Sequence, residues 1–215
     1  MTDHKLPVQQ TTIPFNRYVT FVLLAGGGLA WDLYSKWAVF TQLGCPGAGN
    51  WVWPDNWGWQ GLSPFIRFQL HTNFNYGALW GMGQGKSHLF ASLSVIAALG
   101  ILCWMFVYKG AASKWLTVAL GFVMGGVLGN LYDRLGLHGW TDANHAPIYA
   151  VRDFLHFWFF EGTPAHFDWA IFNFADVYLV TGAIMLVIQS LFLEPATKTN
   201  DIAGPITTTA ANSQA

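Results

Sequence analysis

Gly125-Gly-Val-Leu-Gly-Asn-Leu-Tyr-Asp-Arg134 is the stretch that decides how this chain folds, because it closes a long apolar segment on a group of polar residues. Phe172-Asn-Phe-Ala-Asp176 opens a second apolar segment in the same way. A charged side chain in hydrocarbon is costly, so an ionisable residue on a membrane helix is by default a hypothesis for a functional site. If the two segments cross a membrane in opposite directions, their carboxylates reach the same end, which predicts a shared polar pocket there.

The composition is that of an integral membrane protein. Of the 215 residues, 53% are hydrophobic and 10% are charged, whereas a soluble domain has roughly 25% charged residues. Twelve Trp and seven Tyr residues suit the aromatic belts that mark the two membrane interfaces. A net charge of −1 argues against a nucleic-acid-binding surface.

Four segments approach the ~20 apolar residues that a membrane-spanning helix requires. They are residues 18–40, 88–108, 115–135 and 172–193. The sequence therefore predicts an all-α membrane bundle of four transmembrane helices with a small extracytoplasmic segment that contains β-structure. The first span carries Asp32 and Lys36, and these charges distinguish it from a cleavable signal peptide, whose apolar region is shorter and uncharged.

Residues 15–194 form one membrane domain in this interpretation, flanked by polar tails, 1–14 and 195–215, that we expect to be disordered. The distribution of basic residues assigns both tails to the cytoplasm, although the longer segments on the other side also carry basic residues. The basic residues of the tails and of the loop between the second and third spans are Lys5, Arg17, Lys109, Lys114 and Lys198.

Two longer segments, 41–87 and 136–171, fall on the outer side. The first contains the Trp-rich run 51–59, which fits an interfacial platform and a packed loop equally well. It continues with the alternating stretch Ile66-Arg-Phe-Gln-Leu-His71, which predicts a short strand.

The polar residues of the spans gather at the outer end. At 1.5 Å per residue, Asp32 lies ~22 Å along the first helix from Arg17, in its outer half. The third span ends outside and the fourth begins outside, so their acidic residues reach the same level, and Gln189 is the exception near the inner end. A proton relay or transport path needs polar groups through the full depth of the bilayer. The pattern therefore favours a site that opens at the membrane surface and acts on a membrane-embedded substrate.

Each polar group also has a structural interpretation. Asp32 and Lys36 are spaced i, i+4, as in an ion pair on one helix face. Asp133 adjoins Arg134 and fits a scaffold network. Asp176 could complement the positive end of a helix, an effect of roughly 0.3–1 kcal/mol. Small residues at helical spacing favour close helix packing; they are Gly125, Gly126 and Gly129.

Metal and nucleophile motifs are absent from the sequence. The histidines of the second outer segment, His138, His145, His156 and His166, show neither HExxH spacing nor a paired-cysteine motif. No GxSxG motif marks a serine nucleophile, and Cys103 lies in an apolar run away from any base. We therefore expect no metal and no cofactor, and carboxylate chemistry remains.

Five blocks, in order, resemble the motifs of the lipoprotein signal peptidases (signal peptidase II), a family of four-helix aspartic peptidases of the bacterial inner membrane. They are Asp32-Leu-Tyr-Ser-Lys36, Asn75-Tyr-Gly-Ala-Leu-Trp80, Gly125 to Arg134, Val151-Arg-Asp-Phe154 and Phe172 to Asp176. The third and fifth blocks are specific, the first is weak alone, and the resemblance spans residues 32 to 190.

The resemblance implies that Asp153 and Asp176 are the catalytic aspartates. It implies a substrate-binding set, which is Asn75, Gly77, Asn130, Arg134 and Asn173, and leaves Asp32, Lys36 and Asp133 as structural polar residues. The implied substrate is a diacylglyceryl-prolipoprotein, which is cut before its lipidated cysteine. We expect the enzyme to be a monomer in contact with membrane lipid.

Two alternatives remain. The stretch between Arg134 and Asp153 is longer than in the family and contains Asp142, which competes for the catalytic position, although Val-Arg-Asp-Phe fits the block better. The runner-up function is a small polytopic transporter or channel subunit that uses membrane carboxylates as an ion relay. A lipoprotein signal ending at Leu43-Gly-Cys45 is rejected, because Asp32 and Lys36 interrupt its apolar core.

Overall fold

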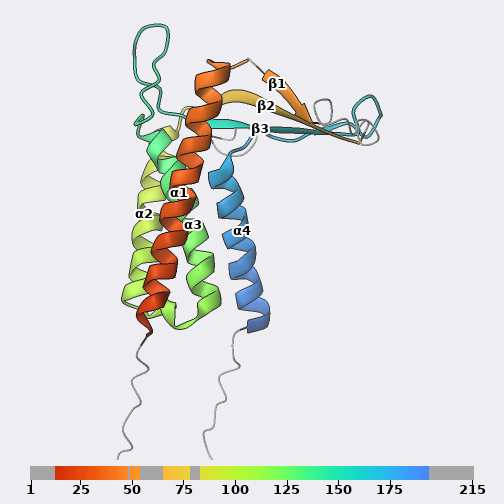
Figure 1. Cartoon of the computed structure of the whole chain (residues 1–215). Helices are drawn as coiled ribbons and strands as arrows, with labels where there is room; N and C mark the ends of the chain where they lie inside the picture. Colours follow the sequence, from red (N-terminus) through yellow and green to blue (C-terminus); the bar gives the residue numbers. More distant parts are fainter. Residues whose placement is uncertain (1–12, 48, 54–64, 78–82, 194–215) are drawn as a thin grey trace, which may run out of the picture.

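The computed structural model describes residues 13–193 except 48, 54–64 and 78–82, and it combines a helical bundle with a sheet across one end (Figure 1). The four long helices are α1 (Phe15–Leu43), α2 (Ser87–Phe106), α3 (Lys114–Arg134) and α4 (Phe174–Ile188). A short 3-10 turn, η3 (Gly110–Ala112), precedes α3, and α4 continues as the π-helical turn η4 (Gln189–Leu193). We call the end of the bundle that carries the sheet the sheet end.

Within the part of the chain that the structure describes, three helices are long and apolar enough to cross a membrane. These are α2, α3 and the continuous helix Phe174–Phe192. The α1 helix is not among them, because Asp32 and Lys36 reduce the mean hydropathy of the half that lies nearer the sheet. Three of the four predicted spans therefore meet the criteria of length and composition, and each lies within a few residues of the predicted range.

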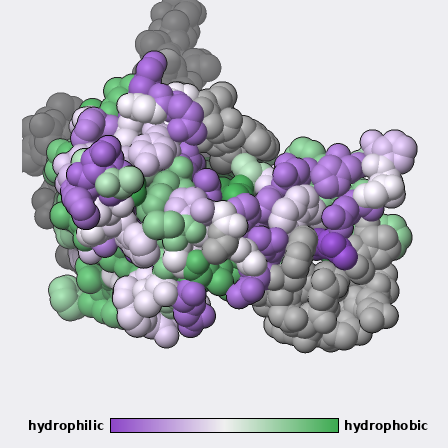
Figure 2. All heavy atoms as spheres, turned by 90° about the horizontal axis from the view of Figure 1, so that it is seen from above, coloured by the Kyte–Doolittle hydropathy of each residue, from purple (hydrophilic) through white to green (hydrophobic). Residues whose placement is uncertain are grey.

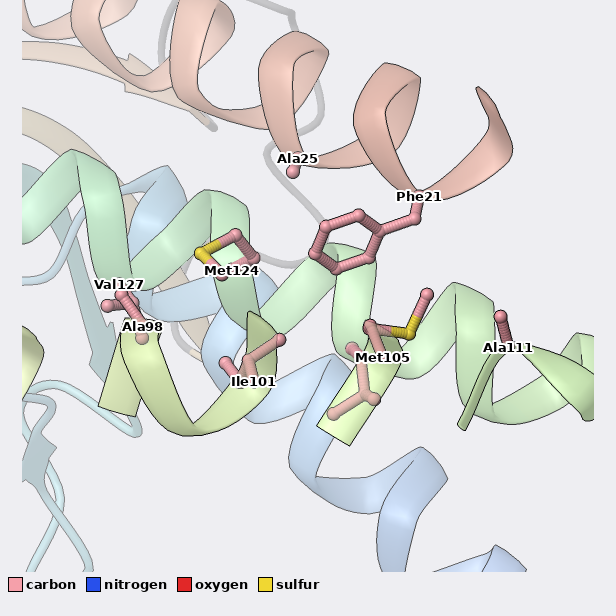
Figure 3. Packing of buried hydrophobic residues seen from close by; sticks show 9 residues of the cluster. Phe21, Ala25, Ala98, Ile101, Met105, Ala111, Met124 and Val127 are labelled. Carbon is pink, nitrogen blue, oxygen red and sulfur yellow. The ribbon is translucent and has the colours of Figure 1, made fainter. Parts of the chain in front are cut away.

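Buried apolar side chains hold α1, α2 and α3 together away from the sheet (Figure 3). Phe21 of α1 points toward Met105 of α2 and Met124 of α3, and all three are at most 3% exposed. Lipid tails are as apolar as these side chains, so close van der Waals packing contributes more to such a bundle than the hydrophobic effect.

Glycines let α3 lie close to its two main neighbours, α1 and α4. A Cβ at Gly125 would lie 3.2 Å from the Ala25 carbonyl oxygen of α1. A Cβ at Gly126 would collide with the Ala175 carbonyl oxygen of α4. The predicted packing role of the small residues is confirmed.

The sheet is larger than predicted. Its strands are β1 (Gly49–Trp53), β2 (Ile66–Asn75), β3 (Val151–Phe159) and β4 (Phe167–Asp168), in the order β1-β2-β3-β4 and antiparallel throughout. The predicted strand at 66–71 is confirmed as part of β2. The predicted β-structure beside the helical bundle is therefore confirmed, although it forms a four-stranded sheet rather than a small segment.

Strand β3 was not predicted, because its apolar and aromatic residues fall on both faces instead of alternating with polar ones. The sheet end carries hydrophilic residues over both the bundle and the projecting sheet (Figure 2). Residues 54–59 of the Trp-rich run and nearly all of both tails lie outside the described residues.

Candidate active site

Asn173 caps the start of α4 and ties it to Asp176. The Asn173 side-chain oxygen accepts a hydrogen bond from the Asp176 N–H at 3.1 Å. In return, Asp176 Oδ2 accepts one from the Asn173 N–H at 3.1 Å. This capping box satisfies two donors that a helix N-terminus otherwise leaves unpaired. It also orients both side chains, so the predicted capping role of Asp176 is confirmed.

The residue before the cap joins α4 to the sheet. The Phe172 carbonyl oxygen accepts hydrogen bonds from the Phe154 and Leu155 N–H groups at 3.0 and 2.8 Å. The Phe172 N–H donates to the Leu155 carbonyl oxygen at 3.0 Å. These bonds hold β3 against the first turn of α4, and they bring Asp153 of β3 beside Asn173.

Two asparagine amides connect the two carboxylates. Asn173 Nδ2 donates to Asp153 Oδ1 at 2.6 Å and to Asn130 Oδ1 at 3.2 Å. Asn130 Nδ2 donates in turn to Asp176 Oδ1 at 2.8 Å. Asp153, Asn130 and Asn173 are at most 4% exposed, whereas Asp176 is partly exposed. The pair of aspartates predicted from the blocks is therefore brought together by one hydrogen-bonded network.

The end of β2 completes the surroundings of Asp153. Asn75 Nδ2 donates to Asp153 Oδ2 at 3.0 Å, and Asn75 Oδ1 accepts from the Gly77 N–H at 3.0 Å. Arg134 Nη2 lies 3.4 Å from the Gly77 carbonyl oxygen, and its guanidinium lies 5.5 Å from the centre of the Phe90 ring. The structure thus gathers the five predicted substrate-binding residues around the two aspartates.

The buried carboxyl of Asp153 holds its proton more tightly than an ordinary aspartate. Burial, and then the nearby Asp176 carboxylate, raise the pKa of Asp153 well above 3.8, while Lys36 and the amides of Asn173 and Asn75 oppose the rise. Two interacting carboxyl groups of this kind titrate as a unit and share a proton over a wide pH range. Such a pair can supply a general acid and a general base at one site.

A second buried network lies next to the first. Lys36 Nζ lies 2.7 Å from Asp32 Oδ2 and 3.1 Å from Asp133 Oδ2. Arg152 donates to Asp133 Oδ1 from Nε at 3.0 Å and from Nη2 at 2.8 Å. Asp32 Oδ1 accepts from the Ala175 N–H at 2.8 Å, so this network also holds the start of α4. The predicted ion pair between Asp32 and Lys36 is confirmed.

An apolar groove of about 470 Å³ runs beside Asp176, between the sheet and the outward face of α4. Aromatic side chains of β3 and of the segment between β4 and α4 form one wall, and the first half of α4 forms the other. The lining residues are Phe157, Phe159, Trp169, Phe172, Asp176, Val177, Val180 and Thr181.

The family model for signal peptidase (SPase) II matches residues 24–192, most of the chain. The chain belongs to this family. It is accordingly a lipoprotein signal peptidase, an aspartic peptidase that cleaves prolipoprotein signal peptides. Family membership decides against the transporter alternative.

Curated relatives support this assignment. The lipoprotein signal peptidase of Rhodopirellula baltica is 42% identical over 182 residues, which cover 85% of this chain and 76% of that protein. The lipoprotein signal peptidase of Geobacillus thermodenitrificans is 30% identical over 190 residues, which cover 86% of this chain and 98% of that protein.

The fold is also similar to solved structures. One is a bacterial membrane enzyme determined by the in meso method at 2.3 Å resolution, with a TM-score of 0.62 and 23% identity. The match covers 86% of this chain and 95% of that one. A second, at 1.9 Å resolution, has a TM-score of 0.59 and 24% identity, and it covers 81% of this chain and 94% of that one.

In this signal peptidase, Asp142 does not lie with the pair. Asp142 is exposed in the loop before β3, where its carboxylate accepts hydrogen bonds from the Asn144 and Ala146 N–H groups at 2.8 and 2.9 Å. These bonds are typical of an aspartate that stabilises a turn. Of Asp142 and Asp153, the fold therefore brings Asp153, on strand β3, to Asp176.

The partner of Asp133 differs from the prediction. The sequence interpretation set Asp133 in a scaffold network beside Arg134, but its partners in the structure are Arg152 and Lys36. Consecutive residues on a helix point in directions about 100° apart, so Asp133 and Arg134 face different neighbours. Arg152 is the structural residue that the sequence interpretation missed.

Proposed function

We propose that Asp153 and Asp176 are the catalytic pair of this signal peptidase. The observation that carries the proposal is the continuous network from Asp153 through Asn173 and Asn130 to Asp176. The ionised member of the pair takes a proton from a water molecule as the water attacks the scissile carbonyl carbon. The protonated member hydrogen-bonds the carbonyl oxygen and then transfers its proton to the departing amine.

The asparagines and Arg134 position both the pair and the substrate. Asn75 and Asn173 direct amide hydrogens at the two oxygens of Asp153, which orients that carboxyl group. Arg134 is partly exposed next to Gly77, and its guanidinium suits a substrate carbonyl or a lipid phosphate.

The substrate in this proposal is a prolipoprotein that already carries a diacylglyceryl group, and it is cut on the N-terminal side of the lipidated cysteine. The groove beside Asp176 supports a substrate with a large apolar part, because its walls are almost entirely aromatic and aliphatic. Such a groove accepts a lipid chain or an apolar signal segment without leaving polar groups unpaired.

Four spans, including α1, cross the inner membrane of a bacterium in this proposal. The 29 residues of α1 extend about 43 Å at 1.5 Å per residue, more than the ~30 Å hydrocarbon core. Its charged residues Asp32 and Lys36 are buried against α4 and α3. Apolar side chains of α1 are exposed, among them Val22, Leu23 and Trp37. The sheet end faces outward, both tails are cytoplasmic, and the enzyme acts as a monomer.

The test is cleavage of a diacylated prolipoprotein by purified variants in detergent or vesicles. Asp153→Asn and Asp176→Asn should each abolish cleavage while the protein still inserts and folds. Asp142→Asn is the matched control and should cleave like the wild type. An active Asp153→Asn enzyme together with an inactive Asp142→Asn enzyme would move the catalytic pair and refute the proposal.

A further inference from the structure

The buried ammonium group of Lys36 has a contact that a scaffold ion pair does not require. Besides Asp32 and Asp133, Lys36 Nζ donates to Asn130 Oδ1 at 3.2 Å. Lys36 is fully buried, so this contact is not screened by water. Asn130 is the residue whose amide reaches Asp176.

The contact fixes which way the Asn130 amide faces. Asn130 Oδ1 accepts from two donors, Lys36 Nζ and Asn173 Nδ2. If the amide were turned over, its NH2 group would face those donors and its oxygen would face the Asp176 carboxylate. Asn173 has little freedom to compensate, because its own Nδ2 is also bonded to Asp153 at 2.6 Å.

We infer that Lys36 is a positioning residue for the peptidase reaction, which acts through Asn130 on the aspartate pair. It holds the Asn130 amide in the orientation that donates to Asp176, and its charge favours the ionised form of the pair. This inference rests on the proposed catalytic roles of Asp153 and Asp176, and it gives Lys36 a part beyond the ion pair with Asp32.

The charges around the pair fit this role. On the α1 side the pair faces Lys36, with Asp32 behind it. On the α3 side it faces Arg134. Arg152, next to Asp153 on β3, is paired with Asp133 of α3. Lys36 lowers the pKa of Asp153 against the effects of burial and of Asp176. Loss of the ammonium group should therefore move the titration of the pair to higher pH.

The test compares Lys36→Met with Asp32→Asn, by kcat and KM across pH in detergent and by thermal unfolding. Both variants break the ion pair of α1, but Lys36→Met also removes the donor to Asn130. We expect Lys36→Met to lower kcat about tenfold at neutral pH. This factor corresponds to the loss of roughly one hydrogen bond to a charged network. Its KM should change less than twofold. The pH profile should move to higher pH, because a nearby positive charge favours the ionised form of a carboxyl group.

Asp32→Asn should lower the melting temperature and leave the pH profile in place. The double variant Asp32→Asn/Lys36→Met covers the case in which Lys36→Met does not fold, because removing both partners of a buried pair leaves one fewer uncompensated charge. It should show the same displaced profile. A folded variant without Lys36 that keeps the wild-type profile overturns the inference. An active Asp153→Asn enzyme would instead overturn the catalytic pair itself, so the two failures are distinguishable.

Discussion

Asp133→Asn gives a demanding test of the second network, because every oxygen of this carboxylate has a partner. Oδ1 accepts from Nε and Nη2 of Arg152 at 3.0 and 2.8 Å. Oδ2 accepts from the Arg152 backbone N–H at 3.0 Å and lies 3.1 Å from Lys36 Nζ. An asparagine at this position must point its NH2 group at one of these donors, whichever way the amide is turned.

The expected cost follows from burial. Asp133 and Lys36 are fully buried and Arg152 is 4% exposed, and removal of one partner from such a buried pair costs about 3–5 kcal/mol. In a chain of this size, 1 kcal/mol corresponds to about 2–4 °C in melting temperature. We therefore expect Asp133→Asn to melt about 6–20 °C below the wild type.

Thermal unfolding in detergent, followed by tryptophan fluorescence, measures this shift, and cleavage below the transition measures activity per folded molecule. Glu161→Gln is the control, because the Glu161 and Arg67 side chains are 45% and 27% exposed and a surface pair contributes about 1 kcal/mol or less. Folded Asp133→Asn protein should retain cleavage. A variant that melts like the wild type and is fully inactive would refute the scaffold role.

Two further predictions concern pH and the groove. Because burial and Asp176 raise the pKa of Asp153, the pair should lose its shared proton, and kcat should fall, only at a pH well above 3.8. The stability contributed by protonated Asp153 is likewise present at low pH and is lost as the pH rises through the folded-state pKa. A kcat profile that already falls with rising pH near 4 contradicts the assignment. In the groove, Val180→Trp should raise the KM for a diacylated substrate about tenfold, by filling space that the apolar part of the substrate needs. The control is Val187→Trp, because Val187 lies two turns further along the same face of α4 and is similarly exposed. This substitution should leave KM unchanged. Equal effects of the two substitutions on KM would exclude the groove as a substrate site.

The sequence was most informative where a local rule decides the structure. The i, i+3 spacing of Asn173 and Asp176 predicted that the two side chains share a face. In the structure they bond each other's backbone in a capping box. The alternation at 66–71 predicted part of β2. By contrast, β3 was missed because it is covered on both faces near Asp153, and a strand buried on both sides has no period-two pattern.

Arg152 was missed for a different reason, although the chain does contain a signal for it. Two buried acids, Asp32 and Asp133, cannot both be neutralised by Lys36 alone. Arg134 follows Asp133 directly on the helix and so cannot share its face. A second cation from another element is therefore required. A count of the acidic and basic residues expected to be buried points to Arg152, the basic residue next to Asp153.

The same count explains why two charged networks can lie side by side at this end of the bundle. Asp32 and Asp133 carry two negative charges, and Lys36 and Arg152 carry two positive ones, so the scaffold network has no net charge. An aspartate pair that shares one proton carries a single negative charge, which Arg134 faces from α3. A neutral scaffold adds little long-range field of its own, because its opposite charges largely cancel at a distance. The ionisation of the pair then depends on burial and on the few groups nearby. One of these is Lys36, which is linked to Asp176 through Asn130.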